Sequence, residues 1–272
     1  MLFAPFLLAL LFFLVLGAVI GSFINVVIIR TIEGESWVAG RSRCDHCRKN
    51  IAWFDNVPLI SFFLLKGKCR YCKKNIALSH PVVEALTALL FVWWYIGLFF
   101  FFKLTQEPFV VLQPLFWLTV AVILLIIFFT DLLVLLIPDK LVLALSVLVV
   151  VYRIALIYSG IMQPRDFFLA LIGMVVLVLF FFALWFFSGG RGLGFGDVKL
   201  IAPLSLLMGW PEMIVGVFTA FCTGAVVGLF LVATKRHALK QPLPFGPFLI
   251  IGTIVALVWG NEVIAWYLQL FS

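Results

Sequence analysis

The chain has 272 residues, of which 65% are hydrophobic and only 11% are charged, and its formal net charge is +7. This composition excludes an ordinary soluble domain, because long uncharged runs would expose more apolar surface than water tolerates. The basic surplus suits an anionic lipid surface, and nothing in the sequence indicates nucleic-acid binding. The sequence therefore predicts an all-α polytopic membrane protein.

Apolar runs predict the membrane spans in chain order. Five uncharged runs reach or exceed the roughly 18 residues that cross a bilayer; they are 2–29, 85–102, 108–130, 167–190 and 213–234. Residues 141–164 and 241–261 predict two more spans. A shorter uncharged run, 200–211, predicts a short helix over 198–211 that starts at or just after Asp197. We expect about eight transmembrane helices.

Basic residues indicate the orientation of these spans. Sixteen of the 19 Lys and Arg residues lie in the segments 30–80, 131–140, 188–199 and 234–243. The positive-inside rule places all four segments in the cytoplasm. Eight crossings with both termini outside satisfy this rule, and the count requires the short run 198–211 to cross as well.

The predicted domains are a first transmembrane helix (1–29), a polar cytoplasmic loop (30–80) and a transmembrane domain (81–272), and no internal repeat is predicted. The loop holds two C-x-x-C pairs, Cys44 with Cys47 and Cys69 with Cys72, separated by 21 residues. Such paired knuckles are typical of a structural tetrathiolate zinc site, in which the metal supplies folding energy to a small domain.

Other uses of these cysteines are less compatible with the loop. Disulfides or a redox-active pair would require an oxidising compartment, which the basic flanks oppose. His46, inside the first knuckle, is expected to be solvated rather than a ligand. The apolar stretch 57–65 is too short to cross, so we expect it to lie along the membrane interface or to pack the knuckles against the helices.

Carboxylates at membrane helices are candidates for function because they are costly to place there. Glu84 is interpreted as an acidic residue that complements the dipole at a helix start. Three aspartates need further explanation: Asp131, flanked by apolar residues, Asp139, and Asp197. We interpret Asp139, which follows Pro138, as a helix N-cap, and capping is also an alternative for Asp197.

Asp197 ends the glycine-rich stretch "GGRGLGFGD", residues 189–197. Glycines let a backbone or a substrate strand approach closely. Two carboxylates in a poorly hydrated site share a proton, so that one can activate water while the other donates to a peptide carbonyl. The sequence lacks the H-E-x-x-H motif of metallopeptidases. These residues favour aspartyl peptide hydrolysis, with Asp131 and Asp139 both open as the partner of Asp197.

Several motifs in a fixed order carry a resemblance to a known family. They are "GSFINVVIIR" (21–30), the two knuckles, "HPVVEALTALLF" (80–91), Asp131 with "IPD" (137–139), "GFGDVKL" (194–200) and "PFGPFLIIG" (244–252). The chain resembles the bacterial type IV prepilin peptidases, membrane aspartic peptidases with a G-x-G-D motif. The resemblance implies that Asp131 and Asp197 are catalytic, with Gly194, Gly196, Lys199 and Asp139 as supporting motif residues.

The resemblance also implies a substrate and a second activity. Members remove the basic leader of type IV prepilins or type II secretion pseudopilins after a glycine, at the cytoplasmic face of the bacterial inner membrane. Many then methylate the new N-terminal amine with S-adenosylmethionine, an activity associated with the knuckle loop, so Gly67 and Lys68 become candidates for cofactor binding. His80 stands where the family typically has a tyrosine.

Two other classes of function stay open on the residues alone. An intramembrane-aspartate transporter or channel would use the carboxylates as a proton or cation relay. A disulfide-handling membrane oxidoreductase would use the cysteines instead.

Overall fold

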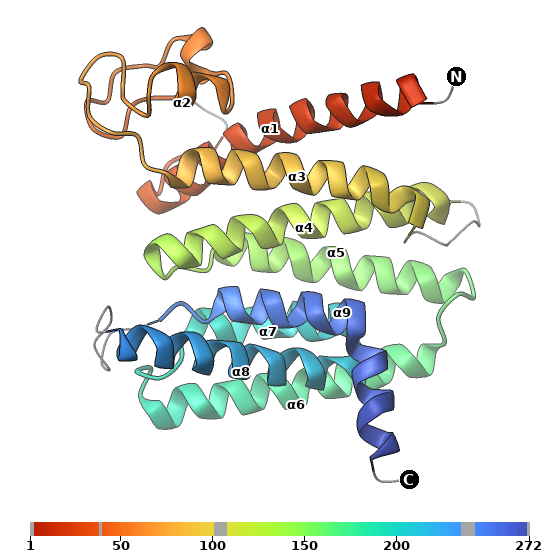
Figure 1. Ribbon diagram of the computed structural model, residues 1–272. Helices are drawn as coiled ribbons and strands as arrows, with labels where there is room; N and C mark the ends of the chain where they lie inside the picture. Colours follow the sequence, from red (N-terminus) through yellow and green to blue (C-terminus); the bar gives the residue numbers. More distant parts are fainter. Residues whose placement is uncertain (1–2, 38–39, 101–107, 235–242, 271–272) are drawn as a thin grey trace. The chain divides into compact units, whose positions relative to one another are not determined.

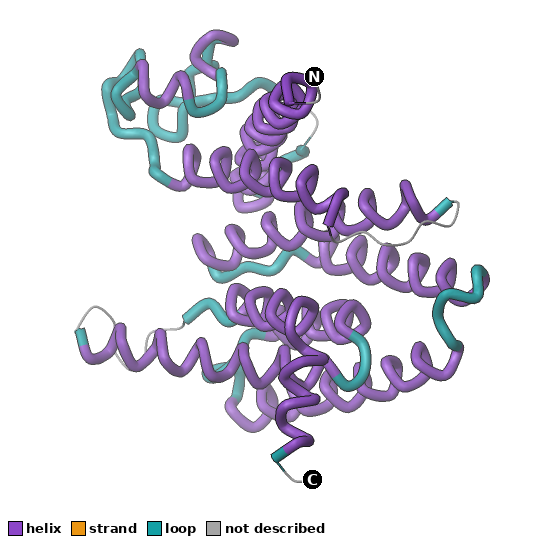
Figure 2. The backbone as a smooth tube through the Cα atoms, turned by 45° about the vertical axis from the view of Figure 1, so that its right-hand side comes forward, coloured by secondary structure: helices purple, strands orange, loops and turns teal. Residues whose placement is uncertain are grey.

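The computed structural model describes residues 3–37, 40–100, 108–234 and 243–270. These residues are nearly all helical and contain no strand beyond two isolated bridges (Figures 1 and 2). The elements are α1 (Phe3–Glu33), η1 (Trp53–Asn56), α2 (Ile60–Leu64), α3 (Ser79–Phe100), α4 (Phe109–Val134), α5 (Asp139–Tyr158), α6 (Pro164–Ser188), α7 (Phe195–Met208), α8 (Glu212–Ala233) and α9 (Gly246–Gln269).

The predicted all-α membrane fold is confirmed. Among the described residues, seven helices are long and apolar enough to cross a membrane: α1, α3, α4, α5, α6, α8 and α9. The chain divides into two compact units, residues 1–122 and 123–272, and the boundary falls inside α4. The first unit contains the cysteine loop, and the second contains both Asp131 and Asp197, which ends the G-x-G-D motif.

In the first unit, α1 and α3 pack against each other through small residues. A methyl group on Gly17 would lie 2.8 Å from the Ala88 backbone, and one on Gly21 would lie 2.7 Å from the Cα of Glu84. Glycines four residues apart form the G-x-x-x-G pattern, which allows helix backbones to approach closely within a membrane. The sequence "GAVIG" therefore sets the contact between α1 and α3.

The cysteine loop contains two copies of one turn, 42–51 and 67–76. In each copy, the first cysteine N–H donates to the carbonyl five residues ahead: Cys44 to Lys49 at 3.0 Å, and Cys69 to Lys74 at 2.9 Å. Each copy also has one residue with a φ of 58°, Arg48 or Lys73, at the same position. The expectation of no internal repeat was therefore wrong, because a ten-residue repeat is too short to stand out in composition.

The stretch between the knuckles folds into η1 and α2 and is tied to α3. The Leu59 N–H donates to the Glu84 carboxylate at 2.8 Å, and the Ser61 hydroxyl donates to the Phe54 carbonyl at 2.9 Å. Glu84 thus lies in the second turn of α3 and holds a loop, so its interpretation as a first-turn dipole residue was wrong. Phe63 and Leu64 are exposed, which leaves an interfacial position for this stretch as a prediction.

In the second unit, α7 contacts α5, α6, α8 and α9, and Figure 1 shows it among the last three of these helices. Ten of its 14 residues are buried, so α7 is the core of this unit. It begins at Phe195, two residues before the predicted start. At 1.5 Å per residue it extends about 21 Å, less than the ~30 Å hydrocarbon layer. The eighth crossing stays a prediction.

Candidate active site

Asp131 is buried near the end of α4, with 5% of its surface exposed. Its Oδ2 accepts a hydrogen bond from the Gly246 N–H at 2.9 Å. Gly246 is the first residue of α9, where the N–H groups have no partner within the helix. A side chain at position 246 would begin 2.7 Å from that carboxylate oxygen, so the contact requires glycine. The start of α9 therefore holds Asp131.

Asp197 lies in the first turn of α7 and is equally buried, with 5% of its surface exposed. Its Oδ2 accepts a hydrogen bond from the Gly194 N–H at 3.1 Å. Gly194 is the N-cap residue and Asp197 is the N3 residue whose carboxylate binds the N-cap N–H, as in a capping box, so capping accounts for one of its two oxygens. Its Oδ1 is buried and has no hydrogen-bond partner among the described residues. An unpaired buried carboxylate oxygen is costly, and such atoms mark sites of catalysis or of bound water.

Ile137 joins the two aspartate-bearing segments. A methyl group on Gly196 would lie 3.1 to 3.3 Å from three Ile137 side-chain carbons, and one on Gly246 would lie 3.4 Å from Ile137 Cδ1. The segment after α4, the start of α7 and the start of α9 therefore meet at one place. The structure thus brings the two predicted catalytic residues together.

Asp139 belongs to a different interaction. It is the first residue of α5, whose N-cap is Pro138, and it makes no side-chain capping bond, so its interpretation as an N-cap was wrong. Its carboxylate instead pairs with the Lys199 ammonium on α7. The Asp139 side chain is 73% exposed and that of Lys199 is 35% exposed, and the ammonium also lies over the Phe195 ring. Asp131 rather than Asp139 is therefore the buried neighbour of Asp197.

The four knuckle cysteines converge in the first unit. All four are free thiols, and their sulfur atoms lie within 4.8 Å of one another, with Cys44 and Cys72 3.9 Å apart. A tetrahedral zinc site with Zn–S bonds of ~2.3 Å has sulfur atoms about 3.8 Å apart. The described residues of this cluster therefore fit a tetrathiolate metal site. His46 is exposed and is not part of the cluster, as predicted.

The surroundings favour the thiolate form of Cys69. Burial raises the pKa of this thiol, but backbone hydrogen bonds at Cys72 and Tyr71 and side-chain bonds with Cys44 and Cys72 lower it to about 7. Zinc binds thiolates, so a thiol that ionises near neutral pH is suited to it.

Gly67 and Lys68, the predicted cofactor candidates, have structural roles. Gly67 has a φ of +68° and its Cα lies under the Phe62 ring, since a methyl group there would be 3.2 Å from Phe62 Cζ. Lys68 bridges to Asn75 in the second turn. Neither lines the hollow described below. His80, which stands in place of a tyrosine, binds the Asp45 carboxylate at 3.0 Å and thereby ties the first knuckle to α3.

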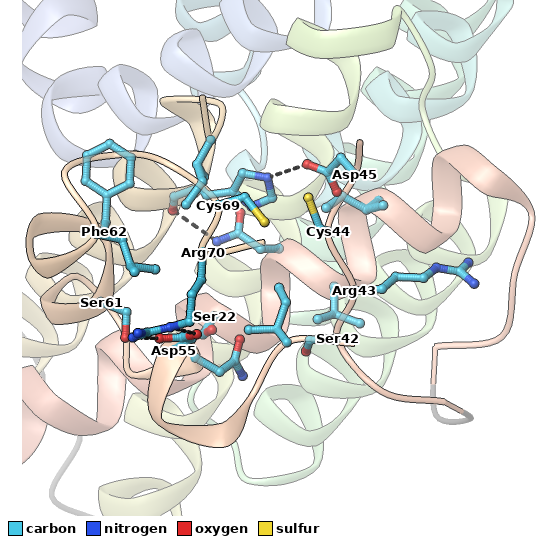
Figure 3. Close-up of a pocket in the computed structure, with 18 of the residues that line it drawn as sticks. Ser22, Ser42, Arg43, Cys44, Asp45, Asp55, Ser61, Phe62, Cys69 and Arg70 are labelled. Atoms are coloured by element: carbon cyan, nitrogen blue, oxygen red, sulfur yellow. Dashed lines mark hydrogen bonds and ion pairs between the residues drawn. The ribbon is translucent and has the colours of Figure 1, made fainter. Parts of the chain in front are cut away.

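A hollow with about 1230 Å³ of empty space, partly open to solvent, lies between the cysteine loop and the ends of α1 and α3 (Figure 3). Cys44 and Cys69 are at its wall, as are Ser22, Phe62 and Glu84. No motif in the sequence indicates this hollow, because its wall comes from four separate stretches of the chain.

Comparison with known proteins identifies the family of the chain. Residues 15–98 match the Bacterial Peptidase A24 N-terminal domain, and residues 118–229 match the Type IV leader peptidase family. The chain is 33% identical to a protein named prepilin leader peptidase/N-methyltransferase from Aeromonas hydrophila, over 93% of this chain and 91% of that one. The chain belongs to the type IV leader peptidase family.

Other relatives carry the same name. The chain is 30% identical to the prepilin leader peptidase/N-methyltransferase of Bacillus subtilis (strain 168), over 94% of this chain and 96% of the relative. It is also 30% identical to that of Pseudomonas aeruginosa, over 94% and 92%. No solved structure gives a significant match. The leader peptidase family region spans both Asp131 and Asp197, and the N-terminal family domain spans all four knuckle cysteines.

Sequence reasoning missed Gly246, Ile137 and the binding role of Glu84. The motif "PFGPFLIIG" contained a signal for Gly246, since a glycine directly before proline at a helix start indicates a close backbone contact. Nothing local indicated Ile137, whose role depends on contacts with residues 59 and 109 positions away.

Proposed function

We propose that the chain is a membrane aspartyl peptidase that removes the leader from prepilins and then methylates the new N-terminal amine. The single observation that carries the peptidase is the pair of buried aspartates, one of which has an unpartnered carboxylate oxygen. The names of the relatives, which join a leader peptidase with an N-methyltransferase, support the two activities.

The aspartate pair accounts for hydrolysis by general acid and base catalysis. Two neighbouring carboxylates in a poorly hydrated site cannot both ionise readily, so the pair holds one proton near neutral pH. The ionised carboxylate takes a proton from water as the water oxygen attacks the scissile carbonyl. The protonated carboxylate donates to the carbonyl oxygen, and a proton then passes to the leaving amine.

Hydrogen bonds hold one oxygen of each carboxylate and leave the other oxygen of Asp197 available for the reaction. Asp131 Oδ2 and Asp197 Oδ2 are each held by a glycine N–H, which fixes the two side chains. Asp197 Oδ1 is then the atom available to the water or the substrate. We assign Gly194, Gly196 and Gly246 to the close packing of this site, and the Lys199–Asp139 pair to the alignment of α7 with α5.

The four basic segments support a cytoplasmic site. We infer that residues 131–140, 188–199 and 234–243 face the cytoplasm of a bacterial inner membrane, with the cysteine loop 30–80 on the same side. The substrates are then prepilin or pseudopilin precursors, cut after the glycine that ends the basic leader. Membrane lipids surround the apolar helices, whose outward side chains are exposed.

We assign the cofactors to the first part of the chain. The thiolates of Cys44, Cys47, Cys69 and Cys72 would hold a structural zinc ion, which stabilises the loop 30–80 between the first helix (1–29) and the transmembrane peptidase domain (81–272). S-adenosylmethionine supplies the methyl group when it is bound. The two other classes of function are not favoured, since the cysteines form one free-thiol cluster and the family is one of peptidases.

Incubation of the purified protein with a prepilin, followed by mass measurement of the product, tests this function. The wild-type protein should release the leader and, with S-adenosylmethionine, add the mass of one methyl group. Asp197→Asn should release no leader while its zinc content stays unchanged. Substantial cleavage by this variant would overturn the aspartyl mechanism.

A further inference from the structure

Arg153 lies inside the membrane-spanning helix α5 and has no part in the chemistry described above. It follows Asp139, the first residue of α5, by about 21 Å along the helix, which places it within an apolar layer of ~30 Å. A charged side chain at this depth is costly and is expected to have a specific role. Carboxylates stand in the first turns of α6 (Asp166) and α8 (Glu212), but the described residues give Arg153 no ion pair. The side chain therefore makes a different kind of contact.

The guanidinium of Arg153 contacts the C-terminal end of α7. Its Nη2 donates to the Leu207 carbonyl at 3.5 Å, which is a long hydrogen bond. A methyl group on Gly209 would lie 2.9 Å from the same nitrogen, so this nitrogen packs directly on the residue that follows α7. Its Nη1 lies 3.7 Å from the Met162 sulfur, on the connection between α5 and α6. The positive charge is thus directed at the backbone of α7.

The end of α7 provides the reason for a cation at this place. The last four carbonyls of a helix have no partner within it, and they form the negative end of the helix dipole. Because α7 is only about 21 Å long, these carbonyls do not reach the far surface of a ~30 Å layer from a start at the cytoplasmic face. The Gly209 N–H donates to the Ser205 carbonyl at 2.9 Å, and Arg153 donates to that of Leu207. Arg153 therefore caps α7 where water is scarce.

Two contacts with α5 hold α7 along its axis. Near the start of α7, Lys199 pairs with Asp139, and near its end Leu207 accepts from Arg153. Side chains of a helix lean toward its N-terminus, so Lys199 reaches back to the start of α5 and Arg153 reaches back to the end of α7. The first contact opposes a shift of α7 toward its C-terminal end. The second opposes a shift in the other direction.

We propose that Arg153 is a positioning residue of the peptidase, which keeps Asp197 level with Asp131 by holding the far end of α7. The proposal rests on the aspartyl peptidase function proposed above. Ten of the 14 residues of α7 are buried, so a shift at one end is passed on to the first turn, which carries Asp197. The Lys199–Asp139 pair is exposed and contributes little, which leaves Arg153 as the stronger hold. A catalytic group displaced by about 1 Å can cost a factor of ~100 in rate.

Three substitutions separate this role from a general effect on the fold. Arg153→Met keeps a long unbranched side chain but removes the charge and every donor. Arg153→Lys keeps a cation that can donate to a carbonyl, so it should restore the hold on α7. Arg165→Met is the matched control, because Arg165 is an exposed arginine in the first turn of α6, at the same end of the unit.

Prepilin cleavage by the full chain in liposomes gives kcat and KM for each variant. Arg153→Met should lower kcat about tenfold to 100-fold and change KM less than about threefold, because the substitution displaces a catalytic group without touching the substrate. Arg153→Lys should stay within about fivefold of the wild-type kcat, and Arg165→Met within about twofold. Hydrogen exchange followed by mass spectrometry gives a readout independent of activity. Exchange at residues 194–199 should be faster in Arg153→Met but not in the control, since the Gly194 N–H is held by Asp197.

Several results would overturn the proposal. One is a kcat of Arg153→Met close to that of the wild type, and another is an equal loss in Arg153→Lys. A raised KM with an unchanged kcat would show that Arg153 contacts the substrate instead. Faster exchange throughout the second unit would show that it only stabilises the fold. If Arg153→Met does not fold, Arg153→Gln, which keeps a donor but no charge, replaces it in both measurements. Wild-type protein and Arg165→Met that both fail to cleave would refute the peptidase function itself, and this inference with it.

Discussion

Asp131 and Asp197 are each held through one oxygen by a glycine N–H, from Gly246 and from Gly194. Both contacts are backbone hydrogen bonds, so they orient the carboxylates without placing a cation beside them. A cation would keep a neighbouring carboxylate ionised, whereas an uncharged donor lets the pair share a proton. At this scale the site consists of two acids, two glycines and the Ile137 side chain between them.

The two aspartates should act as one catalytic unit. Asp131→Asn and Asp197→Asn each keep the shape of the side chain but remove a group that exchanges protons. Each should lower prepilin cleavage by about 10² to 10⁴-fold or more. The double variant should be scarcely slower than either single one, because neither half works alone. Single-turnover cleavage in liposomes measures this, and a double variant slower by the product of both effects would contradict it.

Gly246→Ala should disable the site from the α9 side. The added methyl group would begin 2.7 Å from Asp131 Oδ2, which must then move. We expect at least a tenfold loss of cleavage, together with a small loss of stability from overpacking. Gly228→Ala on α8 is the control, since nothing lies within 4 Å of that position, and it should cleave at the wild-type rate. Equal rates for the two variants would show that the Asp131–Gly246 contact is dispensable.

The catalytic candidates of the site could be predicted from the sequence, whereas the residues that pack around them could not. Asp131 and Asp197 stand out because charged residues are rare in apolar runs, and that contrast is local. Gly246 and Ile137 depend on contacts across more than 50 residues, which no local pattern indicates. The glycines of G-x-G-D were expected to admit a substrate strand. The structure shows that Gly196 packs on Ile137 and that Gly194 caps α7.

At the scale of elements, α7 joins the site to the core of its unit. Its first turn holds Asp197, and its remaining length is buried among α5, α6, α8 and α9. The long helices were predictable because each is an apolar run. The interpretations of α7 and Glu84 were less accurate, because helix starts and loop contacts depend on partners that come from elsewhere in the chain.

The Lys199–Asp139 pair should align α7 without being essential. Exposed ion pairs contribute little, so Asp139→Asn should keep cleavage within about fivefold of the wild type. The substitution is tolerated because the ion pair is exposed, whereas the sequence analysis attributed this tolerance to an N-cap role of Asp139. Prepilin cleavage rates of Asp139→Asn and the wild type, measured at low and at high salt, give the size of this loss. The difference between the two rates should be smaller at high salt, because salt screens the ion pair in the wild type. A loss as large as that of Asp131→Asn would instead place Asp139 in the chemistry.

At the scale of the whole chain, the thiolate cluster and the aspartate pair belong to different compact units. The loop between α1 and α3 has two short helices and two turns, too little for an apolar core of its own. Metal binding can supply the missing folding energy, as it does in other small thiolate domains. The loop was predictable from the cysteine spacing, whereas the division of the chain inside α4 was not.

Zinc should therefore be needed by the loop. Elemental analysis of the purified protein should give about one zinc per chain, and Cys72→Ser should lose it. Because the metal orders both turns, limited proteolysis should then cut between residues 42 and 76. Cys222→Ser, on α8 and outside the cluster, should keep both zinc and protease resistance. A metal-free wild-type protein with an ordered loop would refute the zinc assignment.

The short length of α7 has a consequence for the surrounding lipid. The helix α7 is itself buried among its neighbours, but it is about 21 Å long beside helices long enough for a ~30 Å layer, so the exposed glycine-rich segment before Asp197 meets the lipid short of that thickness. Most of residues 189–194 are exposed, and four of the six are glycines, which offer no apolar side chain to the acyl chains. The bilayer should be thinner beside this segment, which brings lipid headgroups and their water of hydration closer to the two carboxylates. We therefore expect hydrolysis to take place where the membrane is locally thinned, and lipids with longer acyl chains should slow it.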